Sequence, residues 1–368
     1  MTTEQQHPFS SADYVFMSEA IRLAEKGLYT TSPNPRVGCV IVKNGEIIGR
    51  GWHEKAGLPH AEINALKQAA TEVKGSTVYV TLEPCCHHGR TPPCTDALIN
   101  AGIAKLIIAM QDPNPLVAGK GIQQLRTAGI EVQYGLLEAQ ANQLNIGFVS
   151  RMVRQQPWIR VKIAASLDGK IALANGKSQW ITGEAARTDV HRLRARSCAI
   201  LTGINTIKHD DPELSVRHVQ TTRQPLRVIL DNRLEITANA KVLQKTSSLI
   251  FTTLQDSEKI QSLTEKGAQV IVLPSPTGKL DLAEVMSKLA EFELNEILVE
   301  AGSTLNGALI ESQLVDEIII YCAPILLGNS AQSMLNLPEL TSLAQKWKLE
   351  ITEIGKVGCD IKITAKLV

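Results

Sequence analysis

Short apolar runs of strand length alternate with amphipathic, helix-length segments along most of the chain, and this alternation constrains the fold more than any other feature. The first segment, residues 10–27, is a predicted helix in which Ser10 and Asp13 have capping-box spacing. A hairpin follows, because two β-rich runs meet at Asn44-Gly45, a dipeptide that favours tight turns. Beyond it we predict strands at 77–81, 106–110 and 130–134, with helices from about 60, after 94, over 120–128 and up to about 153. This order predicts an α/β fold with helices on the faces of the sheet.

The chain has 368 residues, which is enough for two domains with separate cores. Residues 151–158 read RMVRQQPW, a basic and polar stretch with a Pro and no apolar period, and a new strand begins directly behind it. We therefore predict one domain over residues 1–153 and another over 157–368. No internal repeat is visible, so we expect two different folds. The strands predicted for the second half are 159–164, 199–202, 226–230, 248–251, 269–273 and 296–299, with further strands from 316 onward.

Composition excludes several classes of protein. Lys and Arg total 38 against 37 Asp and Glu, so the chain has no overall basic field with which to hold nucleic acid. The apolar runs are too short to span a membrane, and the N-terminal residues lack the pattern of a signal peptide. Seven cysteines, an odd number with three of them clustered, favour metal binding in a reducing compartment over a disulfide framework. We expect a cytoplasmic protein.

One His and two Cys form a candidate metal site. His60 begins a predicted helix, Cys85 follows Pro84 at the end of a strand, and Cys94 begins the next helix. One His with two Cys can hold zinc and leave its fourth position open to water, which is the arrangement of a catalytic site. The positive ends of the two helix dipoles would favour thiolates at both cysteines.

Glu62 indicates what such a site does. A structural zinc site has no use for a carboxylate two residues after a ligand, whereas a hydrolytic site needs a group that takes a proton from zinc-bound water and returns it to the leaving group. The pattern H-x-E, followed by P-C and a further Cys, is similar to that of the zinc-dependent nucleobase deaminases. Eight residues separate Cys85 from Cys94, so the spacing departs from the usual P-C-x-x-C. We predict Glu62 to be catalytic.

The segments HAE and LEPCCHHGRTPPC, with SPNPRVG and GWHEKAG upstream and DPNP downstream, resemble the deaminase half of the bifunctional riboflavin-biosynthesis deaminase-reductases. The resemblance covers nearly all of residues 10–150. Cys86 stands where this family is expected to have Ser, so either Cys85 or Cys86 could be the ligand, and we favour Cys85 because it directly follows Pro84. The matching segments also supply the expected substrate contacts, namely Asn34, His53, His87, Asp112 and Asn114, with His88 as a further candidate.

The most informative turn of the second half follows the strand that ends near Glu300. There Ala301, Gly302, Ser303 and Thr304 lead into a helix, whose free backbone N–H groups could hold a phosphate. A plain strand-to-helix turn would look similar. No G-x-G-x-x-G sequence is present, so a Rossmann dinucleotide site is not supported.

Four further segments, VKIAASLDGKIA, SQWITG, HRLRARSCAILTGINTIKHDDPELSVR and EILVEAGSTLNGALIE, resemble the reductase half of the same family, which is similar to dihydrofolate reductase in fold and uses NADPH. The resemblance therefore implies a cytidine-deaminase-like α/β/α domain followed by a dihydrofolate-reductase-like α/β domain. The residues that it places at the cofactor are Ala164, Trp180, Thr206, Asp210, Gly302, Ser303, Thr304, Leu305 and Asn306. The residues that it places at the substrate are Ser178, Arg194, Leu214, Arg217 and Glu300, with Lys162 and Thr182 as further candidates.

The resemblance implies two consecutive reactions on a small phosphoribosylaminopyrimidine. The first is zinc-dependent deamination of 2,5-diamino-6-(5-phospho-ribosylamino)pyrimidin-4(3H)-one, and the second is NADPH-dependent reduction of the ribosyl side chain of the resulting uracil. Arg194 and Arg217 would bind the ribose phosphate, and the proton donor of the reduction is left open between Lys162 and Asp210. We expect Zn²⁺ and NADPH as cofactors and a homo-oligomer as the assembly.

Two other interpretations remain open. The chain could be a zinc deaminase of free nucleobases or tRNA with an accessory nucleotide-binding domain, although its near-zero net charge argues against a tRNA partner. It could also be a binding module in which zinc only supports the fold. Glu62 distinguishes the two classes, because a module without catalysis would not need it.

Overall fold

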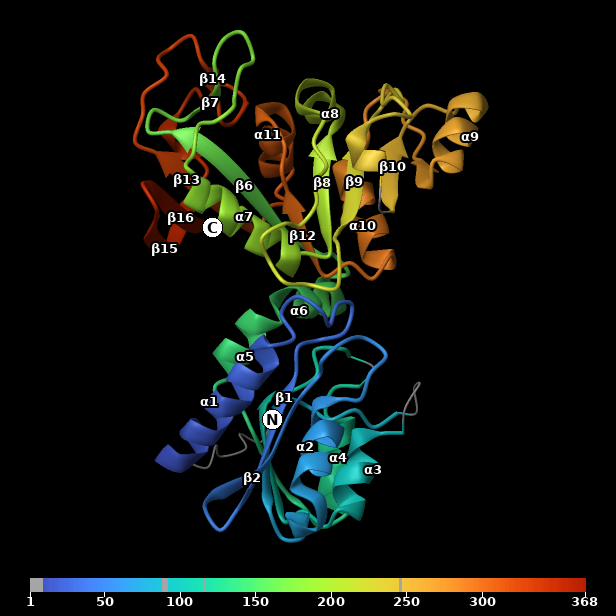
Figure 1. The fold of residues 1–368 in the computed structure, drawn as a ribbon, viewed down its shortest axis with the longest axis vertical. Coiled ribbons are helices and arrows are strands. Elements are labelled where there is room, and N and C mark those ends of the chain that lie inside the picture. The colour runs from blue at the N-terminus through green and yellow to red at the C-terminus, as the bar shows by residue number, and fades with distance from the viewer. Residues whose placement is uncertain (1–8, 88–91, 116, 245–246) are drawn as a thin grey trace. The chain divides into compact units, whose positions relative to one another are not determined.

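The computed structural model describes residues 9–87, 92–115, 117–244 and 247–368. His88, one of the candidates above, lies outside these residues. The chain divides into two compact units, Met1–Gln155 and Gln156–Val368, each built on its own sheet (Figure 1). Within the described residues, no helix has the length and apolar character needed to cross a bilayer.

The first unit contains a five-stranded sheet with the order β2-β1-β3-β4-β5. Strand β1 runs antiparallel to β2 and β3, whereas β3, β4 and β5 are parallel to one another. Asn44 and Gly45 both have positive φ in the turn between β1 and β2, as the Asn-Gly dipeptide predicts. The strands are β1 (Gly38–Lys43), β2 (Glu46–Trp52), β3 (Thr77–Leu82), β4 (Lys105–Met110) and β5 (Glu131–Tyr134).

Helices cover both faces of this sheet (Figure 1). Helix α1 packs Met17 and Leu23 against one face, and α2 packs Ala61 and Ala65 on the other face. The capping box of Ser10 and Asp13 is present at the start of α1. The helices are α1 (Ser11–Glu25), α2 (Ala61–Ala69), η1 (Ala70–Val73), α3 (Cys94–Asn100), α4 (Lys120–Thr127), α5 (Glu138–Leu144) and α6 (Ile146–Arg154).

The prediction of a single helix up to about residue 153 is wrong. The structure has two helices there, α5 and α6, which are separated at Asn145. Asn145 is 1% exposed, and its side chain binds backbone rather than solvent. Its Oδ1 accepts the N–H of Arg36 at 2.7 Å, and its Nδ2 donates to the carbonyl of Arg36 at 2.9 Å. These long-range hydrogen bonds stabilise the break, and local sequence gives no sign of them.

The second unit contains a nine-stranded sheet with the order β11-β10-β9-β8-β12-β6-β13-β16-β15. All neighbours from β11 to β13 are parallel, whereas β16 and β15 are antiparallel. A small sheet pairs β14 with β7. The strands are β6 (Trp158–Ser166), β7 (Lys170–Ala172), β8 (Ala199–Gly203), β9 (Leu226–Leu230), β10 (Ser248–Thr252), β11 (Ala268–Val272), β12 (Glu296–Val299), β13 (Glu317–Ala323), β14 (Gln332–Ser333), β15 (Leu349–Val357) and β16 (Asp360–Leu367).

Successive side chains of these strands point to opposite faces of the sheet and belong to two separate hydrophobic cores. Leu201 and Val228 pack against α10 and α11 on one face, while Ile200 and Ile229 pack against α8 and α9 on the other. Helix α7 covers the second face near β13. The helices are α7 (Glu184–Arg196), α8 (Ile204–Asp210), η2 (Lys241–Leu243), α9 (Ser257–Glu265), α10 (Leu282–Glu291), α11 (Ser303–Glu311) and η3 (Leu343–Gln345).

Candidate functional site

The first site is the cluster of His60, Cys85 and Cys94. His60 is the N-cap of α2, Cys85 lies in the loop after β3, and Cys94 is the first residue of α3. Their candidate ligand atoms all lie within 4.8 Å of one another. His60 Nδ1 is 3.3 Å from Cys94 Sγ and 3.6 Å from Cys85 Sγ. A tetrahedral zinc ion places nitrogen and sulfur ligands about 3.6 Å apart, so the donor set and its spacing fit zinc.

The loop that carries Cys85 is fixed to the start of α3. The backbone N–H of Cys94 points at Cys85 Sγ at 3.4 Å, and the N–H of Thr95 donates to the carbonyl of Cys85 at 3.2 Å. The side-chain hydrogen bond from Cys94, together with His60, lowers the pKa of Cys85 to about 4. The thiolate is the form that binds a metal. Cys86, the alternative ligand, is not part of the cluster.

Glu62 lies in the first turn of α2 and is 3% exposed. Burial and the nearby Cys85 raise its pKa to about 6. With Cys85 and burial, the carboxyl group of Glu62 raises the pKa of Cys94, so it lies against the cluster. A buried carboxylate beside a three-ligand set, without a salt bridge among the described residues, has the arrangement expected of a proton carrier.

Two of the expected substrate contacts lie next to His60. His53 meets the ring of His60 edge-on with centroids 5.4 Å apart. His53 Nδ1 faces the carbonyl of Pro59 at 3.2 Å, so this nitrogen carries the proton, and His53 Nε2 accepts the amide of Asn34 at 3.1 Å. Burial lowers the pKa of His53, which favours this neutral form. His87, by contrast, is exposed.

Glu83, which the sequence analysis did not single out, binds the loop that contains Asp112 and Asn114. The N–H of Asp112 donates to Glu83 Oε2 at 3.2 Å, and Asp112 Oδ1 accepts the N–H of Asn114 at 2.8 Å. Glu83 is 3% exposed and also accepts the N–H groups of Gly119, Gly121 and Ile122. Its only signal in the sequence is its position two residues before Cys85.

The second site is a cavity of about 520 Å³ at the carboxyl ends of β8, β9 and β12, where open α/β sheets bind ligands. Of the expected cofactor contacts, Thr206 and the turn from Gly302 to Leu305 line it. Ser178, an expected substrate contact, lines it too. Lining residues that sequence reasoning did not single out include Asn205, His209, Asn232, Lys279 and Gln332.

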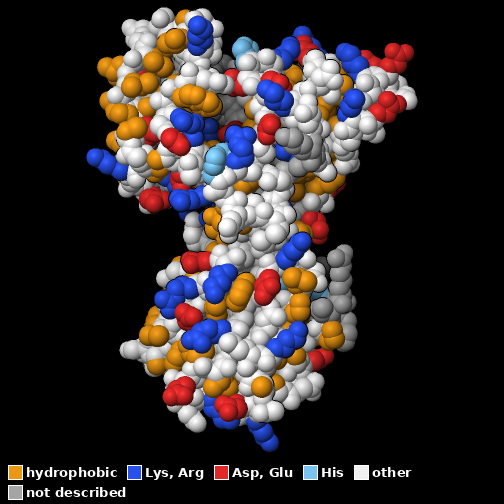
Figure 2. Space-filling view, in the orientation of Figure 1, with side chains coloured by type: hydrophobic (Ala, Val, Ile, Leu, Met, Phe, Trp, Pro, Cys, Tyr) orange, Lys and Arg blue, Asp and Glu red, His pale blue; other side chains and the backbone are white. Residues whose placement is uncertain are grey.

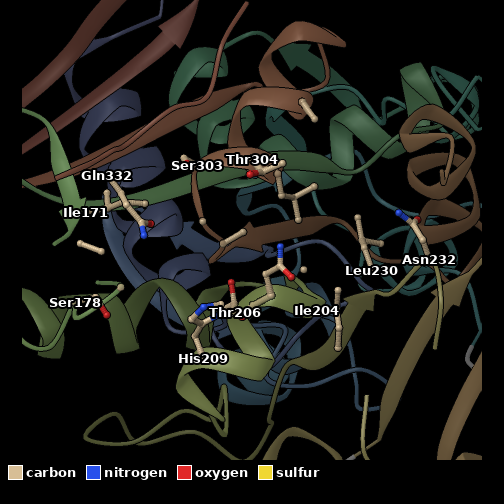
Figure 3. Close-up of a pocket in the computed structure, with 18 of the residues that line it drawn as sticks. Ile171, Ser178, Ile204, Thr206, His209, Leu230, Asn232, Ser303, Thr304 and Gln332 are labelled. Carbon is tan, nitrogen blue, oxygen red and sulfur yellow. Dashed lines mark hydrogen bonds between the residues drawn. The ribbon is translucent and has the colours of Figure 1, made fainter. Parts of the chain in front are cut away.

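Figure 3 shows how these side chains face the cavity. Ser303 and Thr304, at the start of α11, lie across it from Thr206 and His209 of α8. The carboxamide oxygen of Asn232 accepts the N–H of Leu280 at 3.0 Å. This bond ties the end of β9 to the loop that carries Lys279.

The remaining expected cofactor contacts do not line this cavity. Ala164 lies within β6, Asp210 is the last residue of α8, and Asn306 is buried and binds the carbonyl of Ala301. Trp180 is 70% exposed, with the guanidinium of Arg187 over its ring at 4.8 Å.

An ion cluster lies at the end of β12. Arg194 binds both oxygens of Glu300, at 2.5 and 3.0 Å, and Lys162 Nζ lies 3.5 Å from Glu300 Oε2. Although burial opposes it, Arg194 and then Lys162 lower the pKa of Glu300 to about 2. Lys162, whose side chain is largely buried, therefore has Glu300 as its ion-pair partner. Arg194 also donates to the carbonyl of Ser215 at 3.0 Å, so the expected phosphate donor is largely occupied within the protein.

The other expected substrate contacts differ in exposure. The side chain of Arg217 is 55% exposed and lies 3.6 Å from Glu213. Leu214 is buried and has positive φ. Thr182 is 8% exposed, and its carbonyl accepts a hydrogen bond from Arg187 at 2.7 Å.

Comparisons with known proteins cover both halves of the chain. The model of the RibD C-terminal domain matches residues 157–363, and that of the cytidine and deoxycytidylate deaminase zinc-binding region matches residues 10–110. The chain is 47% identical over 361 residues to the riboflavin biosynthesis protein RibD of Escherichia coli K12, covering 95% of this chain and 98% of that protein. The chain belongs to the RibD family.

Other relatives agree. RibD of Haemophilus influenzae is 48% identical over 368 residues, with 97% of this chain and 98% of that protein covered. The structure of Acinetobacter baumannii RibD, form 1, matches with a TM-score of 0.91 at 43% identity, covering 97% of this chain and 99% of that one. The Thermotoga maritima deaminase-reductase structure matches with a TM-score of 0.87 at 32% identity, with the same coverage.

Membership of the RibD family sets the function of the two units. The chain is a bifunctional enzyme of riboflavin biosynthesis, with a deaminase in its N-terminal half and a reductase in its C-terminal half. The first half has a cytidine-deaminase-like fold and the second a dihydrofolate-reductase-like fold. Zn²⁺ and NADPH are the cofactors, and the substrate is a small molecule.

Proposed function

We propose that His60, Cys85 and Cys94 hold the zinc ion and that the first unit deaminates 2,5-diamino-6-(5-phospho-ribosylamino)pyrimidin-4(3H)-one. The mutual distances of the three ligand atoms carry this assignment. When bound, zinc lowers the pKa of a coordinated water molecule to about 7. The net reaction adds water to the amino-bearing carbon and releases ammonia, which leaves the corresponding uracil.

Glu62 is the proton carrier of this reaction. Its carboxylate carries two protons in turn: the first passes from the attacking water to the ring nitrogen, and the second passes from the new hydroxyl group on the carbon to the amino group, which leaves as ammonia while the carbonyl forms. Burial favours this cycle, since a pKa of about 6 lets the carboxyl group both accept and release a proton near neutral pH. His53, neutral and fixed by Asn34 and Pro59, lies beside the ligand cluster, where its ring can orient the substrate.

The second unit reduces the ribosyl group of the deaminated product to ribityl. NADPH, when bound, supplies the hydride. The turn from Gly302 to Thr304 would hold its phosphates, because the N–H groups at the start of α11 border the cavity and a Cβ on Gly302 would meet no atom within 4 Å. Lys279, a cation at the same cavity, adds charge for a phosphate.

Lys162 is the better supported proton donor of this step. Its side chain is 17% exposed and paired with Glu300, so it is held in place beside the other expected substrate contacts. Asp210, the alternative, is exposed at the end of α8. Arg217 is the guanidinium best placed for the substrate phosphate, because its head group is exposed whereas Arg194 is bound by Glu300 and Ser215.

One assay tests both halves. Purified full-length enzyme is given NADPH and the diamino substrate, with Glu62→Gln alongside. We expect wild type to oxidise NADPH and Glu62→Gln to do so only with the deaminated uracil. Glu72→Gln, which neutralises an exposed carboxylate of the same unit, is the matched control and should behave as wild type. Ammonia release by wild type without NADPH oxidation on either substrate would contradict the reductase assignment, and loss of both activities in folded Glu62→Gln would contradict independent sites.

We also propose that the enzyme is a homo-oligomer that assembles through β15. This strand is the edge of the nine-stranded sheet, so one row of its backbone groups has no neighbouring strand among the described residues. Its Ile351 and Ile354 are 55% and 64% exposed. Antiparallel pairing of β15 with its copy about a two-fold axis would cover both. Light scattering should give a mass above 40.0 kDa for wild type, and Ile354→Lys should lower it.

We place the enzyme in the cytoplasm. All seven cysteines, each within the described residues, are free of disulfides. A site built from two thiolates needs a compartment that keeps thiols reduced. Fractionation of cells that express the enzyme should recover it in the cytosol, and recovery with a membrane fraction would contradict this placement.

A further inference from the structure

Residues 211–217, between α8 and β9, have no helix or strand, yet side chains from other segments bind their backbone. The carbonyl of Glu213 accepts Nε of the buried Arg227 at 3.2 Å. The N–H of Val216 donates to the carboxamide of Gln224 at 2.7 Å. We call residues 213–217 the cradle segment. Its conformation is therefore set by its neighbours rather than by a regular hydrogen-bond ladder.

The last residue of the cradle segment, Arg217, is fixed through its main chain by His191 of α7. The backbone N–H of Arg217 donates to His191 Nδ1 at 3.1 Å. His191 is 7% exposed, and its ring meets that of His218 edge-on with centroids 5.3 Å apart. Because Nδ1 accepts a hydrogen bond, the ring must be neutral and carry its proton on Nε2. Burial, with Arg194 and Arg217 nearby, lowers the pKa of His191 to about 4, so this form prevails at neutral pH.

The backbone of Arg217 is thus fixed while its head group stays available. Within the part of the chain that the structure describes, the guanidinium makes one long hydrogen bond, from Nη1 to Ser215 Oγ at 3.5 Å, and one ion pair, with Glu213 at 3.6 Å. A fixed backbone with an exposed and weakly bound guanidinium suits phosphate binding, because less freedom is lost when the contact forms. Figure 2 shows Lys, Arg and His side chains, with carboxylates among them, over the region of α7. Arg192 and Arg194 of this helix are paired with Asp189 and Glu300, which leaves the exposed Arg217 as the better candidate for a phosphate.

We propose that His191 is a positioning residue that fixes the main chain of Arg217 so that its guanidinium meets the phosphate of the reductase substrate. His191 itself touches no reacting atom. This inference rests on the proposed function, in which Arg217 binds that phosphate. It predicts that the contribution of His191 appears only with substrates that carry the phosphate.

The test compares two substrates of the reductase, the deaminated uracil with its 5-phosphate and the same compound without it. In the full-length enzyme, His191→Leu removes the hydrogen-bond acceptor, whereas His191→Asn places Oδ1 near the position of Nδ1. We expect His191→Leu to raise KM about tenfold for the phosphorylated substrate, to change kcat less than about twofold, and to leave KM for the other substrate unchanged. His191→Asn should restore most of the loss.

The deaminase activity of the same molecule, and the thermal unfolding midpoint, report whether each variant is folded. An equal loss by His191→Leu on both substrates, or a loss in kcat alone, would overturn the proposal and leave His191 a purely structural residue. Failure of His191→Asn to restore KM in a folded enzyme would overturn it as well.

Arg217→Met separates this inference from the function on which it rests. If Arg217→Met abolishes the preference for the phosphorylated substrate and His191→Leu adds nothing to it, both are supported. If Arg217→Met leaves that preference intact, the assignment of Arg217 fails. If Arg217→Met abolishes it but His191→Leu alone does not weaken it, only the positioning role of His191 fails.

Discussion

Glu83 accepts the backbone N–H of Gly121 at 2.9 Å, and this contact brings α4 so close to the zinc-ligand loop that a Cβ on Gly121 would lie 2.4 Å from the carbonyl oxygen of Pro84. Pro84 directly precedes Cys85, so anything that moves this carbonyl also moves Cys85, a proposed zinc ligand. The same carboxylate holds the N–H of Asp112. Glu83 therefore links the metal site to the loop that contains the expected substrate contacts.

Gly121→Ala should consequently impair the deaminase. We expect kcat/KM for deamination to fall at least about tenfold and the first unit to lose about 1–3 kcal/mol of unfolding free energy, because the added methyl group cannot fit without moving backbone. The reductase activity should persist. Gln123→Ala, at an exposed position of the same helix, is the control and should leave both activities unchanged. An unimpaired Gly121→Ala deaminase would show that α4 can move away from Pro84 without consequence.

The two neighbouring thiols should differ in their effect on the metal. Cys85→Ser removes a member of the ligand cluster, so we expect the purified variant to lose most of its zinc and its deaminase activity. Cys86→Ser should retain both, because Cys86 lies outside the cluster. Metal content per chain, measured by mass spectrometry, checks this directly. Zinc retention in Cys85→Ser together with loss in Cys86→Ser would reverse the assignment.

Local pattern predicts most of the secondary structure. The strands expected between 77 and 299 are present with ends that differ by at most two residues, because each is a short apolar run bounded by polar or turn residues. The grouping of His60, Cys85 and Cys94 is likewise visible in the sequence as a motif, and the structure brings the three side chains together at the ends of short elements. The strands follow from neighbours along the chain, whereas the ligand cluster is recognised from its residue types, since His60 and Cys94 lie 34 residues apart.

Features that depend on distant contacts could not be predicted. Nothing local shows that Asn145 turns back to bind Arg36, that Glu83 collects backbone N–H groups, or that Glu300 occupies Arg194. In each case the partner lies at least 29 residues away, and its approach is decided by packing of the sheet rather than by propensity. Arg194 looked like a free phosphate donor for this reason.

Substitutions of Arg194 and Glu300 should have strongly non-additive effects on the unfolding free energy. Among the described residues, Arg194→Met leaves Lys162 as the one ion-pair partner of the buried Glu300 carboxylate, so we expect a loss of about 3 kcal/mol in unfolding free energy. In Arg194→Met/Glu300→Gln the uncompensated charge is gone, so the double variant should be more stable than additivity of the two single variants predicts. Urea unfolding of all four proteins gives the coupling energy. Additive losses would mean that the pair does not interact energetically.

Stability of the second unit should depend on pH through His191. Its folded-state pKa of about 4 lies below the ordinary value of 6.5, because burial and the nearby Arg194 and Arg217 oppose a positive charge, while Glu300 favours it. Between these two values the unfolded chain binds a proton that the folded chain does not. The contribution of neutral His191 is therefore complete above about pH 6.5 and is lost as the pH falls toward 4.

His191→Asn isolates this effect, since Asn keeps the acceptor for the N–H of Arg217 but does not titrate. We expect the unfolding free energy of wild type to fall by about 2 kcal/mol more than that of His191→Asn between pH 7 and pH 4.5. The difference between the two proteins is the relevant quantity, because every other titratable group is common to both and contributes equally to both curves. Parallel curves would show that His191 has the same pKa in the folded and unfolded chains, and the hydrogen bond to Arg217 would then not depend on its charge.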